Sequence, residues 1–166
     1  MLDSYYRAFI AEQRYLMYLD GLKMTLLVSL LAIILGVALG TILALMRMTA
    51  ERRGKSTLLS KIAYVYIDII RGTPTVTQLL IMYFVVLKGV DGLIVGTVTF
   101  GLNSAAYVAE IIRAGILAVD HGQMEGGRSL GLSYGQTMKD IILPQAVKNI
   151  LPALGNEFIV LIKETA

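Results

Sequence analysis

Cysteine is absent from this 166-residue chain, and histidine occurs once, at His121. Without cysteine the chain forms no disulfide, holds no metal through thiolates and has no cysteine nucleophile. A single histidine cannot supply the cluster of imidazole ligands found in many zinc sites. The sequence therefore predicts no metal site, and it offers no set of nucleophile, base and metal ligand that would indicate an enzyme.

Charged residues are scarce as well. They make up 16% of the chain against 56% hydrophobic residues, and the mean hydropathy is +0.69. Soluble domains carry about 25% charged residues, so this composition favours a membrane protein. The net charge is +3, but the basic residues gather at the ends of apolar runs. That distribution is typical of membrane topology and argues against a nucleic-acid partner.

The clearest membrane span is the uncharged run between Lys23 and Arg47. A helix of that run is about 35 Å long, which is enough to cross a bilayer. Gly36 and Gly40 lie four residues apart on one face of this helix, a spacing that favours close packing against a neighbour. Chance spacing in a glycine-rich chain is the alternative. We expect residues 1–22 to form a short amphipathic segment at the membrane surface.

The segment after this run, residues 47–61, carries five basic residues against Glu51 alone. Cytoplasmic loops are enriched in Lys and Arg, so this segment is expected in the cytoplasm and the N-terminus outside. Residues 54–57 superficially match a phosphate-binding P-loop. The motif requires glycine at position 49, where this chain has Thr49. It also requires a strand-to-helix context, which is not predicted here. The sequence therefore argues against ATP binding by this chain.

The second hydrophobic region is interrupted by Pro74. Proline lacks an amide hydrogen and disfavours a helical conformation at the preceding residue, Thr73. We therefore expect an interfacial helix over residues 58–71, a break, and a second spanning helix over 73–88. Broken backbone at membrane depth is tolerated only beside protein or a water-filled cavity.

Two further apolar stretches follow. Residues 92–119 are predicted to form the third spanning helix, which returns the chain to the cytoplasm. The polar segment 120–148 contains Arg128 and Lys139, consistent with a cytoplasmic location. A fourth apolar helix is predicted to start at Asn149. The chain is thus expected to have about four membrane-spanning helices.

A spaced pattern of glycine, acidic and apolar residues lies in the polar segment. Its members are Glu125, Gly126, Gly127, Gly131, Ile141, Leu143 and Pro144. This pattern resembles the EAA loop of the permease subunits of ATP-binding-cassette importers, E-A-A-x3-G-x9-I-x-L-P, with glycines in place of the two alanines. The flanking stretches RGTPTVTQLL and LNSAAYVAEIIRAGI are similar to the subfamily that imports polar amino acids, the histidine, glutamine and arginine type of permease.

The resemblance implies an all-α membrane protein with the type I importer permease fold, in which residues 1–166 form one permease domain and 120–148 the coupling loop. It implies that Glu125 and the helix near Gly131 contact ABC ATPase subunits, which would bind ATP and Mg²⁺. A second permease, identical or different, and an extracellular or periplasmic solute-binding protein are the other implied partners. The implied location is a bacterial cell membrane, crossed several times. The resemblance leads us to expect a fifth helix after the fourth, so the alternative is a truncated, transport-inactive fragment or a membrane scaffold.

The local sequence of the loop predicts two helices. We expect one helix over residues 123–130, a reversal at Gly131, where a positive φ is cheap, and a second helix from Ser133 that ends near Pro144. Ser133 and Gln136 have the spacing of a capping box. Glycine in a helix costs about 1 kcal/mol relative to alanine, so Gly126 and Gly127 should make the first helix softer than in the family pattern.

Polar side chains inside the predicted spans are candidates for the substrate pathway, because such groups are costly in lipid. They are Thr75, Gln78, Asn103, Tyr107, Glu110 and Glu157. Asn103, Tyr107 and Glu110 are spaced by four and three residues, so one helix face presents an amide, a phenol and a carboxylate that could hold an amino acid. The alternative for Glu110 is an ion pair with Arg113 or Arg71, and for Asn103 a hydrogen bond to a neighbouring helix. The sequence does not indicate which amino acid would be carried.

Overall fold

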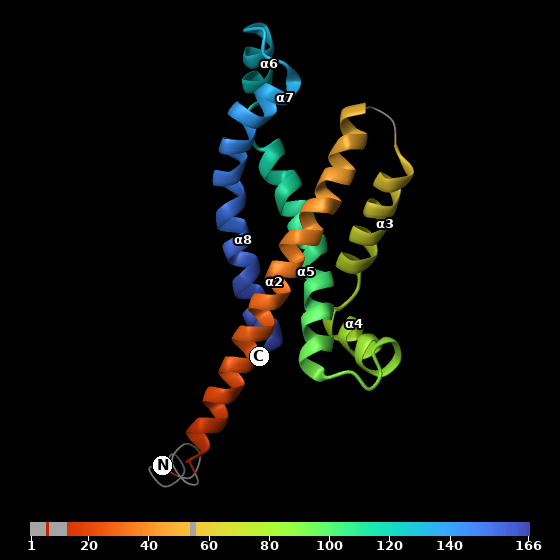
Figure 1. Ribbon diagram of the computed structural model, residues 1–166, viewed down its shortest axis with the longest axis vertical. Coiled ribbons are helices and arrows are strands. Elements are labelled where there is room, and N and C mark those ends of the chain that lie inside the picture. Colours follow the sequence, from red (N-terminus) through yellow and green to blue (C-terminus); the bar gives the residue numbers. More distant parts are fainter. Residues whose placement is uncertain (1–5, 7–12, 54–55) are drawn as a thin grey trace.

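The computed structural model describes residue 6, residues 13–53 and residues 56–166, and these residues form helices joined by short turns, without strands (Figure 1). The elements are α2 (Arg14–Arg53), α3 (Leu58–Gly72), α4 (Thr75–Ile81), the π-helical η3 (Met82–Val86), α5 (Gly92–Leu117), α6 (His121–Ser129), α7 (Tyr134–Thr137), the π-helical η4 (Met138–Ile142) and α8 (Leu143–Thr165). The expected all-α fold is confirmed.

Helix α2 is longer than expected and extends to 40 residues. Residues 14–22, which we predicted in a separate surface segment, belong to this helix. The rest of that segment, residues 1–5 and 7–12, lies outside the described residues. Leucine, methionine and tyrosine dominate the added turns, and adding a residue to a helix is far easier than starting one, so the charges there do not interrupt it.

Two helices are long and apolar enough to cross a membrane, Arg14–Thr49 and Gly92–Leu117. The pair formed by α3 with α4 and η3 would make a third span if both parts are counted together. Helix α8 has 23 residues, about 35 Å, and lies alongside α5 (Figure 1). Polar residues make up a larger share of this helix than of the other long helices, and it is not among the helices that are apolar enough to count as a span.

Helix α5 is the centre of the bundle and packs against α2, α3 and α8. It packs closely on α2 at Gly36 and Gly40. A Cβ atom added at Gly36 would lie 2.8 Å from Ser104 Oγ, and one at Gly40 would lie 2.7 Å from Val108 Cβ. The predicted packing role of the two glycines is therefore confirmed, because any larger side chain would push the helices apart.

The predicted break before Pro74 is confirmed. Helix α3 ends at Gly72 and the following helix turns by 104° from it. The second part is shorter than expected, covering 75–86, and its last turn is π-helical. The Gln78 side-chain amide donates to the Ile70 carbonyl at 2.8 Å and to Thr73 Oγ1 at 2.7 Å. It thereby satisfies one of the carbonyl groups left without a partner at the helix end.

The predicted end of a helix near Pro144 is wrong. Residues 134–165 run continuously through α7, η4 and α8, so the last long helix also does not begin at Asn149. Proline removes one backbone donor, but here it follows a π-helical turn in which the Leu143 amide donates to the Met138 carbonyl. The widened turn shifts the hydrogen-bond register just before the proline, and the helix continues with Pro144 in its first turn.

Candidate functional site

The segment that we predicted to be the coupling loop forms an antiparallel helix pair beyond the ends of α2 and α5 (Figure 1). The Asp120 side chain caps α6 by accepting a hydrogen bond from the Gly122 amide at 2.6 Å. Gly131 adopts a φ of 84°, which confirms the predicted reversal. Ser133 and Gln136 form the predicted capping box at the start of α7. The pair is therefore a defined structure with a cap at the start of each helix.

The two glycines of the pattern lie in different environments. Gly126 is exposed, and a Cβ atom added there would meet nothing within 4 Å. Gly127 is buried, and an added Cβ atom would lie 2.5 Å from Thr137 Cγ2 and 3.2 Å from Ile141 Cδ1. At Gly127 the loss of helix stability that we expected for α6 is therefore offset by closer packing. The missing side chain there lets α6 pack directly on α7 and η4.

The other predicted coupling residues divide into exposed and packed ones. Glu125 is exposed, and within the described residues its carboxylate has no hydrogen bond or ion pair. Leu143 and Pro144 are also exposed, whereas Ile141 packs on the cluster of Val119, Ile142, Ala146 and Ile150. Sequence reasoning missed Leu130, which is 83% exposed at the tip of the pair. Its position directly before the turn glycine, Gly131, could have indicated that this apolar side chain is exposed.

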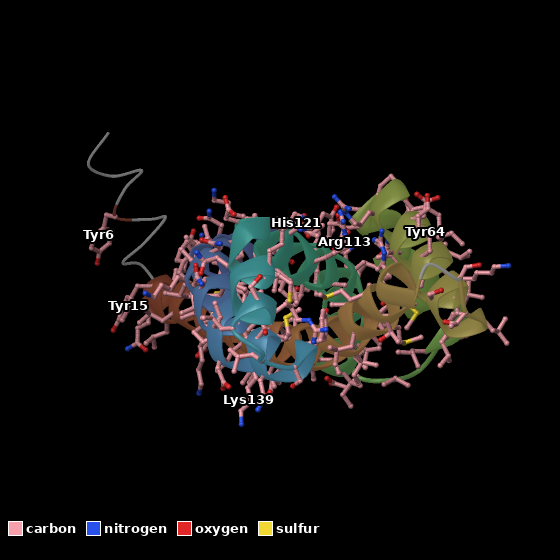
Figure 2. All side chains as sticks on the ribbon, turned by 90° about the horizontal axis from the view of Figure 1, so that it is seen from above. Tyr6, Tyr15, Tyr64, Arg113, His121 and Lys139 are labelled. Carbon is pink, nitrogen blue, oxygen red and sulfur yellow. The ribbon has the colours of Figure 1, made fainter. Side chains whose placement is uncertain are left out.

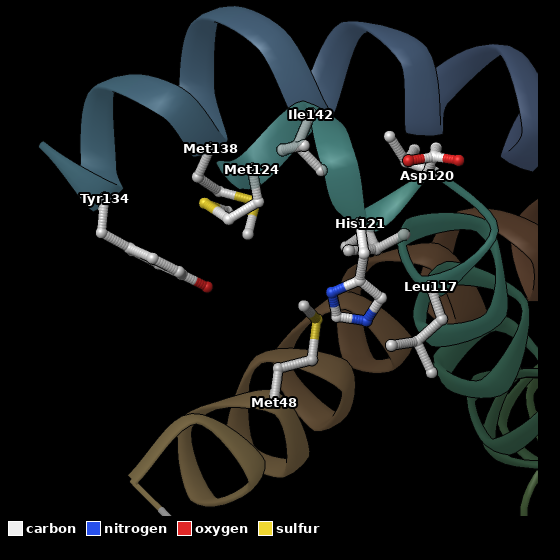
Figure 3. Close-up of a pocket in the computed structure, with 10 residues that line it drawn as sticks. Met48, Leu117, Asp120, His121, Met124, Tyr134, Met138 and Ile142 are labelled. Carbon is white, nitrogen blue, oxygen red and sulfur yellow. The ribbon is translucent and has the colours of Figure 1, made fainter. Parts of the chain in front are cut away.

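A cavity of about 300 Å³ lies beneath the helix pair. Met48, Met124, Met138 and His121 project into it from α2, α6 and η4 (Figure 3). Methionine side chains adapt to irregular space, so this cavity leaves the pair room to shift relative to α2. Among the described residues, no three His, Cys, Asp or Glu side chains are grouped in a way that could hold a metal ion.

The predicted pathway residues on α5 face α3 and α4. The Asn103 amide donates to Gln78 Oε1 at 3.0 Å, which joins α5 to α4. One turn further along α5, the Tyr107 ring lies under the Arg71 guanidinium, with 5.2 Å between the ring centroid and Cζ. Thr75 lies one turn before Gln78, at the start of α4. Four of the six candidates are thus brought to one side of α5, and Glu110 follows one turn beyond Tyr107.

Glu110 forms the centre of an ion-pair group. Its carboxylate pairs with Arg113 on the same helix and with Arg47 of α2, the latter at 2.9 Å. The expected pair with Arg113 is confirmed, whereas Arg71 contacts Tyr107. The pairing with Arg47 could not be predicted, because the two residues are far apart in the chain. Arg47 also lies 5.5 Å from the centroid of the Tyr64 ring, so it connects α2 with α3 and α5.

Replacing Glu110 with glutamine should lower the stability of the purified complex by about 2 kcal/mol, because two guanidinium groups lose their carboxylate. Unfolding in detergent, followed by temperature or denaturant, measures the change. Asp68→Asn is the matched control, since Asp68 is an exposed α3 carboxylate without an ion pair among the described residues. Equal losses in the two variants would contradict the structural role of the Glu110 group.

Glu157 is not part of this group. It is 9% exposed on α8, and its carboxylate accepts a hydrogen bond from Ser104 Oγ at 2.8 Å. Ser104 follows Asn103 on α5, but it points to α8 and α2 rather than to α4. The structure therefore divides the candidate pathway residues into two places around α5, one toward α4 and one toward α8. A view along the bundle shows Arg113 near its middle and Lys139 directed outward (Figure 2).

The bundle and its exposed helix pair define a helical membrane protein with a structured polar segment. The family described as "Binding-protein-dependent transport system inner membrane component" matches residues 36–166, and the chain belongs to it. This family supplies the permease subunits of ATP-binding-cassette transporters. The chain is accordingly an inner-membrane permease subunit and not itself an enzyme, and ATPase and binding-protein partners belong to such systems in general.

Several relatives have assigned names. The chain is 47% identical over 152 residues to the arginine transport system permease protein ArtQ of Bacillus subtilis, covering 89% of this chain and 67% of that protein. It is 46% identical to a putative glutamine transport system permease protein GlnP of Rickettsia bellii, covering 91% and 69%. The glutamine transport system permease protein GlnP of Escherichia coli is 38% identical, with 89% and 68% covered.

A solved structure has the same fold. It is a crystal structure of an amino acid ABC transporter with histidines, and it matches with a TM-score of 0.84 and 45% identity. The match covers 95% of this chain and 73% of that one. The fold implied by the EAA pattern is thus confirmed, and these relatives favour an importer subunit over a membrane scaffold.

Proposed function

We propose that this permease subunit carries a polar amino acid across the membrane and receives its driving force from a separate ATPase at residues 121–144. The observation that carries the proposal is the helix pair itself. It presents the Glu125 carboxylate, which has no ion pair in the part of the chain that the structure describes, and the exposed side chain of Leu130 at the end expected in the cytoplasm. Gly127 fixes this pair on the helix that continues into α8. Such a surface suits a partner that offers a groove and a complementary charge.

The chemistry of the cargo is supported by two kinds of finding. The relatives are named for arginine and glutamine transport, and the similar solved structure for an amino acid transporter. The chain also places a buried carboxylate at Glu157 and paired amides at Asn103 and Gln78 within the bundle. A carboxylate binds an ammonium or guanidinium group, and amides bind the polar remainder of an amino acid.

Transport by such a subunit requires two arrangements of the bundle. Closure of two ATPase subunits would move the helix pair, and the continuous helix 134–165 would carry that motion to Glu157. We propose that a second permease, either a copy of this chain or a sister subunit, completes the pathway, and that a solute-binding protein delivers the amino acid. ATP and Mg²⁺ would be bound by the ATPase.

Reconstitution tests this proposal. The permease, its ATPase and its solute-binding protein are placed in proteoliposomes, with and without a sister permease, and offered radiolabelled arginine, glutamine, histidine, glutamate and leucine. We expect ATP-dependent uptake of one or more of the polar amino acids, with stimulation of ATP hydrolysis by the same compounds. A non-hydrolysable ATP analogue is the control. Uptake of leucine alone, or ATP hydrolysis that no amino acid stimulates, would refute the proposal.

A further inference from the structure

Three arginines from three helices converge on the inner half of the bundle. Arg47 comes from α2, Arg71 from α3 and Arg113 from α5, and all three act electrostatically on Glu110. Glu110 pairs directly with Arg47 and Arg113. Charged side chains inside a membrane protein usually pair or mark the path of a solute. This group carries more positive than negative charge, so it is suited to an anion.

Arg71 differs from the other two arginines. It is exposed in the last turn of α3, about 20 Å along the helix from Leu58, and within the described residues it forms no ion pair. Its guanidinium lies on the face of the Tyr107 ring. Stacking on an aromatic ring stabilises a guanidinium group and fixes its plane, while its N–H groups remain able to donate.

The position of Arg71 along α5 is also informative. Tyr107 lies one turn from Asn103, which bonds Gln78, and one turn from Glu110. Arg71 is therefore held between the paired amides and the ion-pair group. It also immediately precedes the 104° break of the span, where backbone is tolerated only beside protein or a wet cavity.

We propose that Arg71 binds the carboxylate of the cargo during its passage through the permease. The inference rests on the proposed function, since every free amino acid carries a carboxylate whatever its side chain. A guanidinium group binds a carboxylate through two parallel hydrogen bonds, and the Tyr107 ring holds it in one orientation for this purpose. Arg71 is then a specificity residue that distinguishes amino acids from amines of the same shape.

The test measures binding to the detergent-purified permease–ATPase complex without the solute-binding protein, so that the permease alone selects the ligand. The probes are two matched pairs, L-arginine with agmatine and L-glutamine with 4-aminobutyramide, in which the second compound lacks only the carboxylate. Arg71→Gln should weaken binding of the amino acid by about 10- to 100-fold and leave binding of the amine unchanged. Arg71→Lys should retain part of the affinity, because it keeps the charge but loses the planar pair of donors.

Lys88→Gln is the control, because it removes one positive charge from an exposed turn distant from Tyr107. An equal loss for amino acid and amine in Arg71→Gln would show a structural role and overturn the inference, as would an unchanged affinity for both. Binding is also measured with and without added phosphatidylglycerol. If Arg71→Gln abolishes an effect of this lipid but keeps the preference for the carboxylate, Arg71 binds lipid and the inference is overturned. Absence of amino-acid binding by the unmodified complex would instead refute the proposed function.

Discussion

Replacing Gly127 with alanine is expected to cut amino-acid-stimulated ATP hydrolysis several-fold, whereas the same change at Gly126 should leave it intact. The Cβ atom at position 127 would lie 2.5 Å from Thr137 Cγ2. Thr137 is fully buried and β-branched, and its hydroxyl donates to the Ser133 carbonyl at 3.1 Å, so it cannot rotate away at little cost. Overpacking of this kind costs about 1–3 kcal/mol, and α6 must move off α7.

The neighbouring glycine provides the matched control. At Gly126 the added methyl group meets nothing, and alanine stabilises a helix by about 1 kcal/mol over glycine. Stimulated hydrolysis in reconstituted complexes is the measurement for both variants. Adding Thr137→Ala to Gly127→Ala removes the clashing atoms and should restore part of the stimulation. If Gly126→Ala impairs the complex as much as Gly127→Ala does, the contact with Thr137 is not the reason for the glycine.

Glu125→Lys should abolish stimulated hydrolysis while the complex still folds. Glu125 is exposed and has no internal ion pair within the described residues, so reversing its charge disturbs no contact inside the permease. The same change places a positive charge where the ATPase is proposed to meet a negative one, and opposed like charges at an interface cost several kcal/mol. Hydrolysis with and without amino acid, together with co-purification of the ATPase, measures the effect.

Asp20→Lys is the control for this variant. Asp20 is an exposed acid in the N-terminal part of α2, distant from the helix pair, and its reversal changes the net charge by the same amount. It should leave stimulated hydrolysis near the unmodified level. Full stimulation in Glu125→Lys would remove the role of this carboxylate in coupling, even if uptake by the unmodified complex is confirmed.

Local patterns in the sequence predicted the local features of the fold. The break at Pro74, the reversal at Gly131 and the capping box at Ser133 depend on neighbouring residues, and all are present. Pro144 was misleading because the π-helical turn before it shifts the hydrogen bonds. No simple sequence motif predicts the position or the register of such a turn. The beginning of α2 was predicted too late in the chain because scattered charges suggested a boundary near Lys23, whereas the helix begins at Arg14.

Contacts between distant residues could not be predicted from spacing. The polar face of Asn103, Tyr107 and Glu110 was visible in the sequence, but its partners Gln78, Arg71 and Arg47 come from other helices. The sequence also counted Glu157, on another helix, among the pathway candidates. Its hydrogen bond to Ser104 depends on how α8 packs on α5, which follows from the fit of whole helices rather than from any periodicity.

The continuity of residues 134–165 has a mechanical consequence. Where α8 crosses α5, a Cβ atom at Gly115 would lie 2.4 Å from Ile150 Cγ1, so the two helices are closely packed at this point, which we take as the fulcrum of the long helix. Ile150 lies about 24 Å along the helix from Tyr134 and about 10 Å from Glu157. A tilt about this point moves Glu157 in the opposite direction to the coupling end and through less than half the distance. Under the proposed function, a displacement imposed by the ATPase at the coupling end would become a smaller displacement beside Ser104.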